Sequence, residues 1–148
     1  MKSAFFRKTL YILSVFTVVM TTAAILTLPW LVRWYAKNIV LVLIPFSVTV
    51  FIYLTLFPFL TILIAVVKLS RNLMKNNPFS QNSLDQLRAI SICSALDFLL
   101  YVIGVLFYRN LLCIVVLAGT IMVFLISSVV RELITNGIRI KEENDLTI

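Results

Sequence analysis

The sequence predicts an all-α polytopic membrane protein, an antiparallel four-helix transmembrane bundle with both termini in the cytoplasm. Three observations predict this fold class. First, 61% of the 148 residues are hydrophobic and only 13% are charged, whereas soluble domains are roughly 45–50% apolar and about 25% charged. Second, the apolar residues gather in four long runs separated by polar segments. Third, a soluble chain of this length could not bury so much apolar surface in one core.

The first predicted span covers residues 9–32, which hold no charged side chain. About 20 apolar residues are enough to cross a hydrocarbon core of roughly 30 Å. A cleaved signal peptide is the alternative, since Thr22-Ala23-Ala24 resembles a cleavage site. The apolar run is longer than the roughly 7–15 residues of an ordinary signal core, so we expect an uncleaved span.

The second predicted span covers residues 39–67 and is longer than a straight crossing needs. It contains Pro45 and Pro58. Each proline is expected to kink the helix or to mark its start, because proline lacks a backbone N–H and clashes with the preceding turn. Tilt and a kink together would fit the extra length into the bilayer.

A polar connector, residues 68–88, separates the two apolar halves of the chain. Pro78 is expected to end the preceding helix, because proline disfavours helical geometry in the residue before it. Ser83 and Gln86 fit the capping-box pattern, in which a serine caps the helix and a glutamine three positions later bonds back to it. The next helix is therefore expected to start near Ser83.

The third and fourth predicted spans, residues 89–108 and 111–130, are joined by only two residues. So short a link requires the two helices to pack antiparallel beside each other. The tail, residues 131–148, follows the fourth span. Gly137 is expected to end that helix in a left-handed cap, and the residues after it alternate apolar and polar as in a strand. We expect a small ordered cytoplasmic appendage, with a frayed tail as the alternative.

The distribution of lysine and arginine predicts the orientation. The N-terminus holds three, the connector four and the tail three, against two and one in the remaining loops. The positive-inside rule therefore places both termini and the connector in the cytoplasm. The net charge of +7 follows from this pattern, so we expect contact with the lipid bilayer and no direct binding of nucleic acid.

The residue types that common catalytic centres need are scarce. The chain has no histidine, three glycines and two cysteines. It therefore lacks the usual general base and the commonest metal ligand, and it has no glycine-rich phosphate loop. We predict no catalytic residue, no cofactor and no metal site, and hence a protein that is not an enzyme.

Asp97 is the one charged residue inside a predicted span. Near mid-membrane an ionised aspartate costs about 2.5–3.5 kcal/mol, so its side chain should face the bundle interior, most readily in its neutral form. Helical spacing places several polar or small residues on the same stripe: Ser91, Ser94, Asp97, Tyr101, Gly104 and Tyr108. The depth of each residue along its helix puts Tyr53 at about the same level as Asp97.

Two functions fit this stripe. Asp97, Ser94, Tyr101 and Tyr53 could form a polar site for a proton or a small ligand. Alternatively, Asp97 forms a polar contact that only holds helices together, which we favour because no second intramembrane charge completes a proton relay.

The connector and the tail carry the most specific motifs. These are Asn77-Pro78-Phe79 and Arg88 in the connector, and Glu143-Asn144-Asp145-Leu146 with Ile148 at the end of the chain. Together with the four-span layout, they resemble a family of small bacterial membrane proteins catalogued as domain of unknown function 2975. The resemblance implies a multi-pass protein of the bacterial cytoplasmic membrane.

The resemblance also implies a kind of partner. Members of this family are often encoded beside a small helix-turn-helix regulator of the Cro/CI type. We therefore expect a non-enzymatic, regulatory or interaction role, in which the protein binds or restrains such a DNA-binding regulator. The alternative is a transport-associated or small-ligand-binding membrane bundle with a polar site around Asp97. The resemblance implies no catalytic residues, and the sequence predicts no oligomeric state.

The expected interaction surface joins the connector to the tail, because the charge distribution places both on the cytoplasmic side. Besides the motif positions it includes Lys75, which could pair with Glu143 or Asp145. Leu146 and Ile148 would then pack against the inner ends of the helices. Two alternatives remain: the tail adds a strand to a partner's sheet, or the connector and tail only close the inner face of the bundle.

Overall fold

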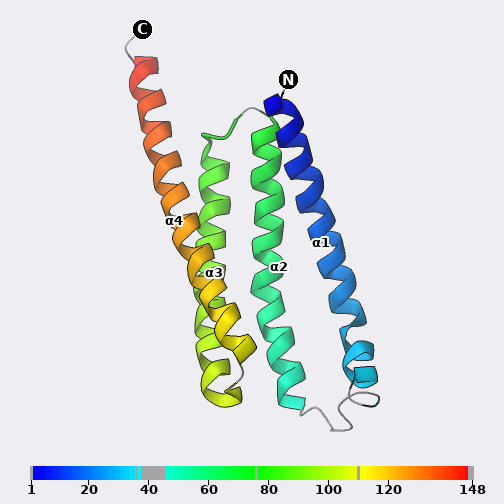
Figure 1. Ribbon diagram of the computed structural model, residues 1–148. Helices are drawn as coiled ribbons and strands as arrows, with labels where there is room; N and C mark the ends of the chain where they lie inside the picture. The colour runs from blue at the N-terminus through cyan, green and yellow to red at the C-terminus, as the bar shows by residue number, and fades with distance from the viewer. Residues whose placement is uncertain (1, 36, 38–45, 76, 110, 147–148) are drawn as a thin grey trace.

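The computed structural model describes residues 2–35, 37, 46–75, 77–109 and 111–146, and within these ranges it contains four helices and no strand. The helices are α1 (Lys2–Tyr35), α2 (Phe46–Met74), α3 (Gln81–Tyr108) and α4 (Leu111–Leu146). Each is long and apolar enough to cross a membrane. The predicted all-α fold with four apolar helices is confirmed (Figure 1).

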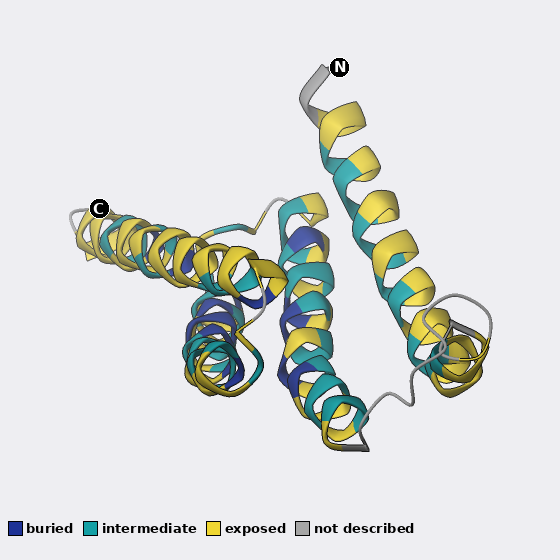
Figure 2. Cartoon of the chain, turned by 60° about the horizontal axis from the view of Figure 1, so that its bottom comes forward, coloured by how far each residue is buried: buried dark blue, intermediate teal, exposed yellow. Residues whose placement is uncertain are grey.

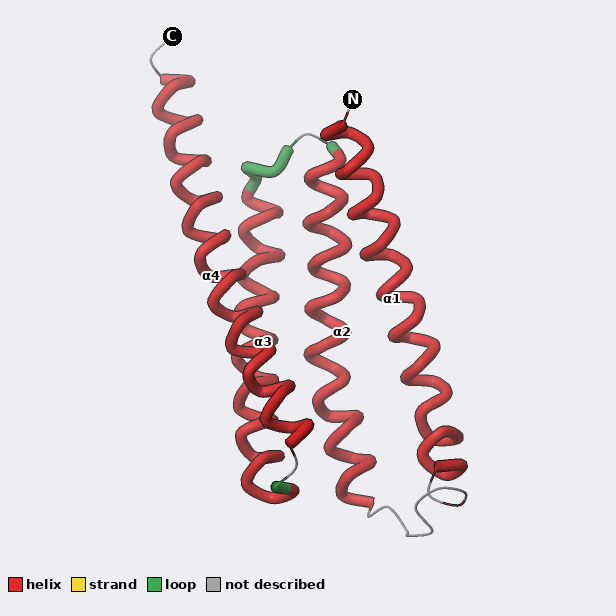
Figure 3. The backbone as a smooth tube through the Cα atoms, in the orientation of Figure 1, coloured by secondary structure: helices red, strands yellow, loops and turns green. Residues whose placement is uncertain are grey.

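Each helix runs antiparallel to the next and packs against it: α1 on α2, α2 on α3, and α3 on α4 (Figures 1 and 3). Between described residues, helices that are not consecutive in the chain make no comparable contact. The bundle is therefore open, with α1 and α4 at its two edges. The N-terminus, the α2–α3 connector and the C-terminus lie at the same end of the molecule (Figure 1), which we call the connector end.

The apolar core lies toward the connector end of α2, α3 and α4. Its buried members are Ile62, Ala65, Leu87, Ile90 and Ile134. Figure 2 shows buried residues on the facing sides of α2 and α3, whereas α1 shows only half-buried and exposed ones. The outward faces carry large apolar side chains, which is the pattern of helices surrounded by lipid.

α3 begins at Gln81, and its N-cap lies three residues before the serine that the sequence indicates. Its N-cap is Ser80, whose backbone is extended and whose hydroxyl accepts a hydrogen bond from the Ser83 backbone N–H at 3.2 Å. Ser83 is fully buried inside the first turn, where its hydroxyl accepts a hydrogen bond from the Asn72 side chain of α2 at 3.2 Å. The helix thus starts close to the predicted position, but the predicted capping by Ser83 is wrong, because Ser80 performs the capping and Ser83 bonds to Asn72 of α2.

α4 continues without interruption to Leu146, so the prediction that Gly137 ends it is wrong, as is the strand-like tail. No described glycine has the positive φ of a left-handed cap. Gly137 instead allows close packing: a Cβ there would lie 2.6 Å from two ring carbons of Phe79. The lysine and glutamates after it are good helix formers, and Arg139 pairs with Glu143 one turn later at 3.8 Å.

The other predicted spans lie inside the observed helices. Residues 9–32 fall within α1, 89–108 within α3, and 111–130 within the first part of α4. Of the second span, residues 39–45 with Pro45 lie outside the described residues, and α2 passes through Pro58 as a continuous helix. The short link at Arg109 does place α3 and α4 side by side, with Arg109 capping α3 in a left-handed conformation (φ 46°).

Candidate functional site

Asp97 faces the interior of the bundle, as its helical stripe predicts. Its side chain is 2% exposed and that of Ser94, one turn earlier, is fully buried. Ile92 and Leu99, which lie off the stripe, are each 60% exposed on the outer face of α3. The periodicity of polar residues along α3 therefore correctly separates the inner face from the lipid-facing one.

A cavity of about 450 Å³ lies beside Asp97, between α2, α3 and α4. Most of its wall is apolar, with side chains such as Leu56 and Val116. The polar groups that line it come from all three helices: Thr55, Ser94, Asp97, Tyr101 and Thr120. The interior at mid-span is therefore hollow, in contrast to the packed core at the connector end.

The carboxyl of Asp97, a residue that lines this cavity, has an unsatisfied oxygen. Within the described part of the chain, Oδ1 of Asp97 is buried and has no hydrogen-bond partner. The neighbouring hydroxyls donate elsewhere: Ser94 to the Ser91 carbonyl at 3.0 Å, and Tyr101 to the Thr55 hydroxyl oxygen at 3.5 Å. A buried polar atom without a partner is unfavourable and rare in folded proteins, so this oxygen marks a candidate site.

The structure brings together three of the four residues predicted for the polar site. Tyr53 is the exception: it is 38% exposed and does not line the cavity. Its place is taken by Thr55, which is 4% exposed and which the sequence reasoning missed. The prediction of Tyr53 is wrong because counting residues along a helix gives the depth of a residue in the membrane but not the direction in which its side chain points. The spacing of Thr55, Ile62 and Ala65 along one face of α2 is the signal that identifies Thr55.

Aromatic side chains close the cavity toward the end opposite the connector. The Phe51 ring lies 5.6 Å from that of Tyr101 and 5.4 Å from that of Tyr108, centroid to centroid. It also covers Gly104, where a Cβ would lie 2.5 Å from the ring. Toward the connector end, Ile62 belongs both to the cavity wall and to the apolar core. The α2–α3 interface is thus packed on both sides of the cavity.

The polar contact between helices that was one hypothesis for Asp97 is made by a serine pair. The Ser91 and Ser127 hydroxyls lie 2.9 Å apart and join α3 to α4. Both residues are buried, and Ser91 also donates to the Leu87 carbonyl at 3.0 Å. Such a bond between membrane helices contributes about 0.6 kcal/mol on average. It lies on the connector side of the cavity, together with the packed core.

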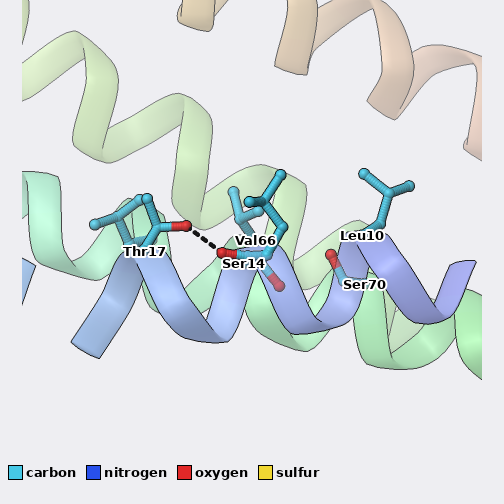
Figure 4. A pocket seen from close by; sticks show the side chains of 7 residues that line it. Leu10, Ser14, Thr17, Val66 and Ser70 are labelled. Atoms are coloured by element: carbon cyan, nitrogen blue, oxygen red, sulfur yellow. Dashed lines mark hydrogen bonds between the residues drawn. The ribbon is translucent and has the colours of Figure 1, made fainter. Parts of the chain in front are cut away.

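A second, smaller cavity of about 190 Å³ lies between α1 and α2 (Figure 4). Its polar side chains include Ser14 and Thr17 of α1 and Ser70 of α2. The Thr17 hydroxyl donates to the Leu13 carbonyl at 2.6 Å, and Ser14 donates to the Tyr11 carbonyl at 2.8 Å. Because these hydroxyls are bonded within their own helix, the cavity offers less to a ligand than the one at Asp97.

At the connector end, the charged and polar residues of the predicted surface are exposed. Lys75, Asn77 and Arg88 lie on the α2–α3 side. Glu143, Asn144 and Asp145 lie on α4. The two sides meet through an apolar contact, in which Phe79 packs on Gly137 while Pro78 beside it is half-buried. Within the described ranges, no three acidic or cysteine side chains gather closely enough to hold a metal ion.

The predicted packing of Leu146 against the inner helix ends is wrong. Leu146 is 87% exposed, because α4 remains helical and carries it beyond the ends of α2 and α3 (Figure 1). Ile148 lies outside the described residues. The end of α4 is therefore a projecting helix that carries acidic side chains.

Comparison with known proteins identifies the family of this chain. The family described as "protein of unknown function (DUF2975)" matches residues 40–148. The match includes α2, the connector, α3 and α4, and it leaves out α1. No curated protein and no solved structure matches the chain. Because the match spans well over half of the sequence, the chain belongs to the DUF2975 family of proteins of unknown function.

Proposed function

We propose that this protein is a non-enzymatic, regulatory protein of the bacterial cytoplasmic membrane. In this proposal both termini and the connector face the cytoplasm, in line with the positive-inside rule. The connector end binds or restrains a small cytoplasmic helix-turn-helix regulator of the Cro/CI type. The family resemblance supports the identity of the partner, and the geometry of α4 supports the mode of binding.

The observation that carries the proposal is the projecting end of α4. The helix continues to Leu146, and Phe79 of the connector packs on it at Gly137. This contact holds the projecting helix at one place on the connector. A preformed helix loses less conformational entropy on binding than a flexible tail does, so α4 can present its surface ready for a partner.

The charge of this helix end suits a DNA-binding partner. Glu142, Glu143 and Asp145 are all exposed near its tip. DNA-binding domains carry a basic surface that contacts phosphate groups. An acidic helix end attracts such a surface by charge complementarity, and its occupation by the membrane protein would compete with DNA. The regulator would thereby be held at the membrane and away from its operator.

The proposal is tested with the full chain in detergent micelles and a purified regulator of the Cro/CI type, the class of partner that the family resemblance implies. The variant E142Q/E143Q/D145N removes three exposed charges and keeps the helix length. We expect its affinity for the regulator to fall at least tenfold, with a loss of salt dependence. Operator DNA should displace the regulator from the unmodified protein.

The matched control is D85N, which removes an exposed acidic charge from α3 at the same end of the molecule. It should bind the regulator as the unmodified chain does. Unchanged affinity in the triple variant, or binding that operator DNA does not displace, would contradict the proposal.

A further inference from the structure

We propose that the cavity around Asp97 is a binding site for a lipophilic amine that enters from the hydrocarbon of the bilayer between α2 and α4. This site lies in the membrane-spanning part of the molecule and is independent of the connector end. Its presence rests on the cavity, on the unsatisfied carboxyl oxygen and on the arrangement of the three helices around them.

The chemistry of the ligand follows from Asp97. The side chain is 2% exposed, and its Oδ1 atom has no hydrogen-bond donor among the described residues. The described cavity wall contains no lysine or arginine that could pair with a carboxylate. A lipophilic amine would take up the carboxyl proton, and the resulting ammonium group would donate a charge-assisted hydrogen bond to this oxygen and balance the charge of the carboxylate. A neutral hydroxyl head group could donate a hydrogen bond but could not balance the charge of the carboxylate. An anionic head group could do neither.

The size and the apolar character of the rest of the ligand follow from the volume and lining of the cavity. Sites for small molecules commonly have volumes of about 300–1,000 Å³ and mostly apolar linings with a few polar groups, and this cavity of about 450 Å³ fits that description. Gly119 of α4 contributes to the space, because a Cβ placed there would meet nothing within 4 Å. A compact chain or ring bearing one amine therefore matches the cavity.

The route of entry follows from the packing. Along the helices, the cavity is flanked by the apolar core on one side and by the contact between Phe51 and Tyr101 on the other. α2 and α4 both line it, yet over their described residues no Cα atom of one helix lies within 8 Å of a Cα atom of the other. The open side of the cavity is therefore the gap between α2 and α4, which faces the lipid. A solute crossing the membrane would meet closed packing in both directions, so the geometry suits binding rather than transport.

The depth of Asp97 excludes the head group of an aminolipid as the occupant. Asp97 lies nine residues from Arg88, the last residue of the polar connector, and eleven from Tyr108 at the other end of α3. At about 1.5 Å per residue these separations are roughly 14 Å and 17 Å, close to the middle of the hydrocarbon. A head group held at the interface cannot reach that far, so the amine belongs to a molecule that dissolves in the hydrocarbon.

The test uses three molecules with the same chain and different head groups: decylamine, decanol and decanoic acid. Binding of radiolabelled decylamine to the full chain in lipid nanodiscs is measured, and the unlabelled molecules compete with it. We expect one saturable site for decylamine and at least tenfold weaker competition by decanol and by decanoic acid. Equal competition by decanol would overturn the role of the charge.

Two variants address the site itself. D97N keeps the size of the side chain and removes the carboxylate, and it should weaken decylamine binding at least tenfold. G119L fills the cavity from α4 and should abolish saturable binding. The matched control A118L adds the same side chain at the neighbouring exposed position and should leave binding unchanged.

Each variant is checked by its unfolding midpoint, so that loss of binding is separated from loss of folding. The two variants act independently, because one changes charge and the other changes volume. Decylamine binding that persists in both D97N and G119L would overturn the proposal. Failure of regulator binding at the connector end would leave these measurements unaffected, since they involve α2–α4 at mid-span only.

Discussion

The connector half of α2–α4 and their middle differ in how they are packed. In the connector half, Leu87 and Ile90 are buried against Ala65 of α2, and the Ser91–Ser127 pair joins α3 to α4. One turn farther along α3, the helices leave a cavity of about 450 Å³ beside a carboxyl oxygen with no described partner. The same three helices are thus close-packed in one place and hollow in the next.

This difference in packing indicates which region stabilises the fold and which region has room for a ligand. Close packing supplies the van der Waals contacts that hold membrane helices together, because burial from lipid gives no hydrophobic gain. A cavity with an unsatisfied polar atom loses those contacts and is kept only where something else requires it. We therefore expect the packed interior of the connector half to contribute most to stability, and the cavity at mid-span to be where the proposed amine binds.

The largest expected effect is in the connector half. Leu87→Ala removes a side chain that is 3% exposed, and we expect the free energy of unfolding to fall by about 3 kcal/mol. The corresponding change in the hollow middle is Val123→Ala, which removes two carbon atoms where Leu87→Ala removes three. Val123 lines the cavity and has fewer contacts to lose, so we expect a decrease below about 1 kcal/mol.

Both values are measured by reversible unfolding of the full chain in mixed micelles with increasing denaturing detergent. The comparison depends on the difference between the two variants. Equal losses would show that the middle is packed as closely as the connector half.

The next effect has the opposite sign. Asp97→Leu replaces a buried carboxyl with an apolar side chain that extends into the cavity. Because no described group satisfies Oδ1 of Asp97, we expect the free energy of unfolding to rise, by up to about 2.5 kcal/mol. The same unfolding measurement applies, without added amine. A marked loss of stability would instead make Asp97 a structural contact between helices and would weaken the distinction between the two halves.

Most of the fold was predictable because hydrocarbon imposes strong rules. Four long apolar runs predict four helices, and the two-residue link at Arg109 predicts that α3 and α4 are neighbours. Helix ends were less predictable, because they depend on tertiary contacts. Ser83 fits a capping pattern, yet its hydroxyl bonds to Asn72 of another helix. Gly137 resembles a terminator, yet it lies in mid-helix under the Phe79 ring.

The candidate site was predictable in part, for a related reason. Periodicity along α3 gives the direction of Asp97, Ser94 and Tyr101, because one helix fixes its own faces. The cavity depends on how far α2 and α4 stand apart, which no single helix encodes. Depth along α2 favours Tyr53 and Thr55 about equally, and only the rotation of the helix about its axis separates the exposed Tyr53 from the buried Thr55. The spacing of buried residues along α2 shows which face of that helix points inward. The volume of the cavity, in contrast, depends on how all three helices are assembled.

The smallest expected effect tests the contact that joins the connector to α4. Gly137→Ala adds a Cβ 2.6 Å from two carbons of the Phe79 ring. Alanine favours a helix by about 1 kcal/mol over glycine, but the ring must move, and it can because Phe79 is 49% exposed. The gain and the loss oppose each other. We therefore expect the free energy of unfolding to change little in the otherwise unmodified chain.

The Phe79→Ala background removes the opposing contact. There, Gly137→Ala should raise the free energy of unfolding by about 1 kcal/mol, because only the helix preference remains. The double-mutant cycle thus isolates the Phe79–Gly137 interaction. The same increase in both backgrounds would mean that Phe79 does not hold α4, and the projecting helix would then depend on the packed core around Ile134 alone.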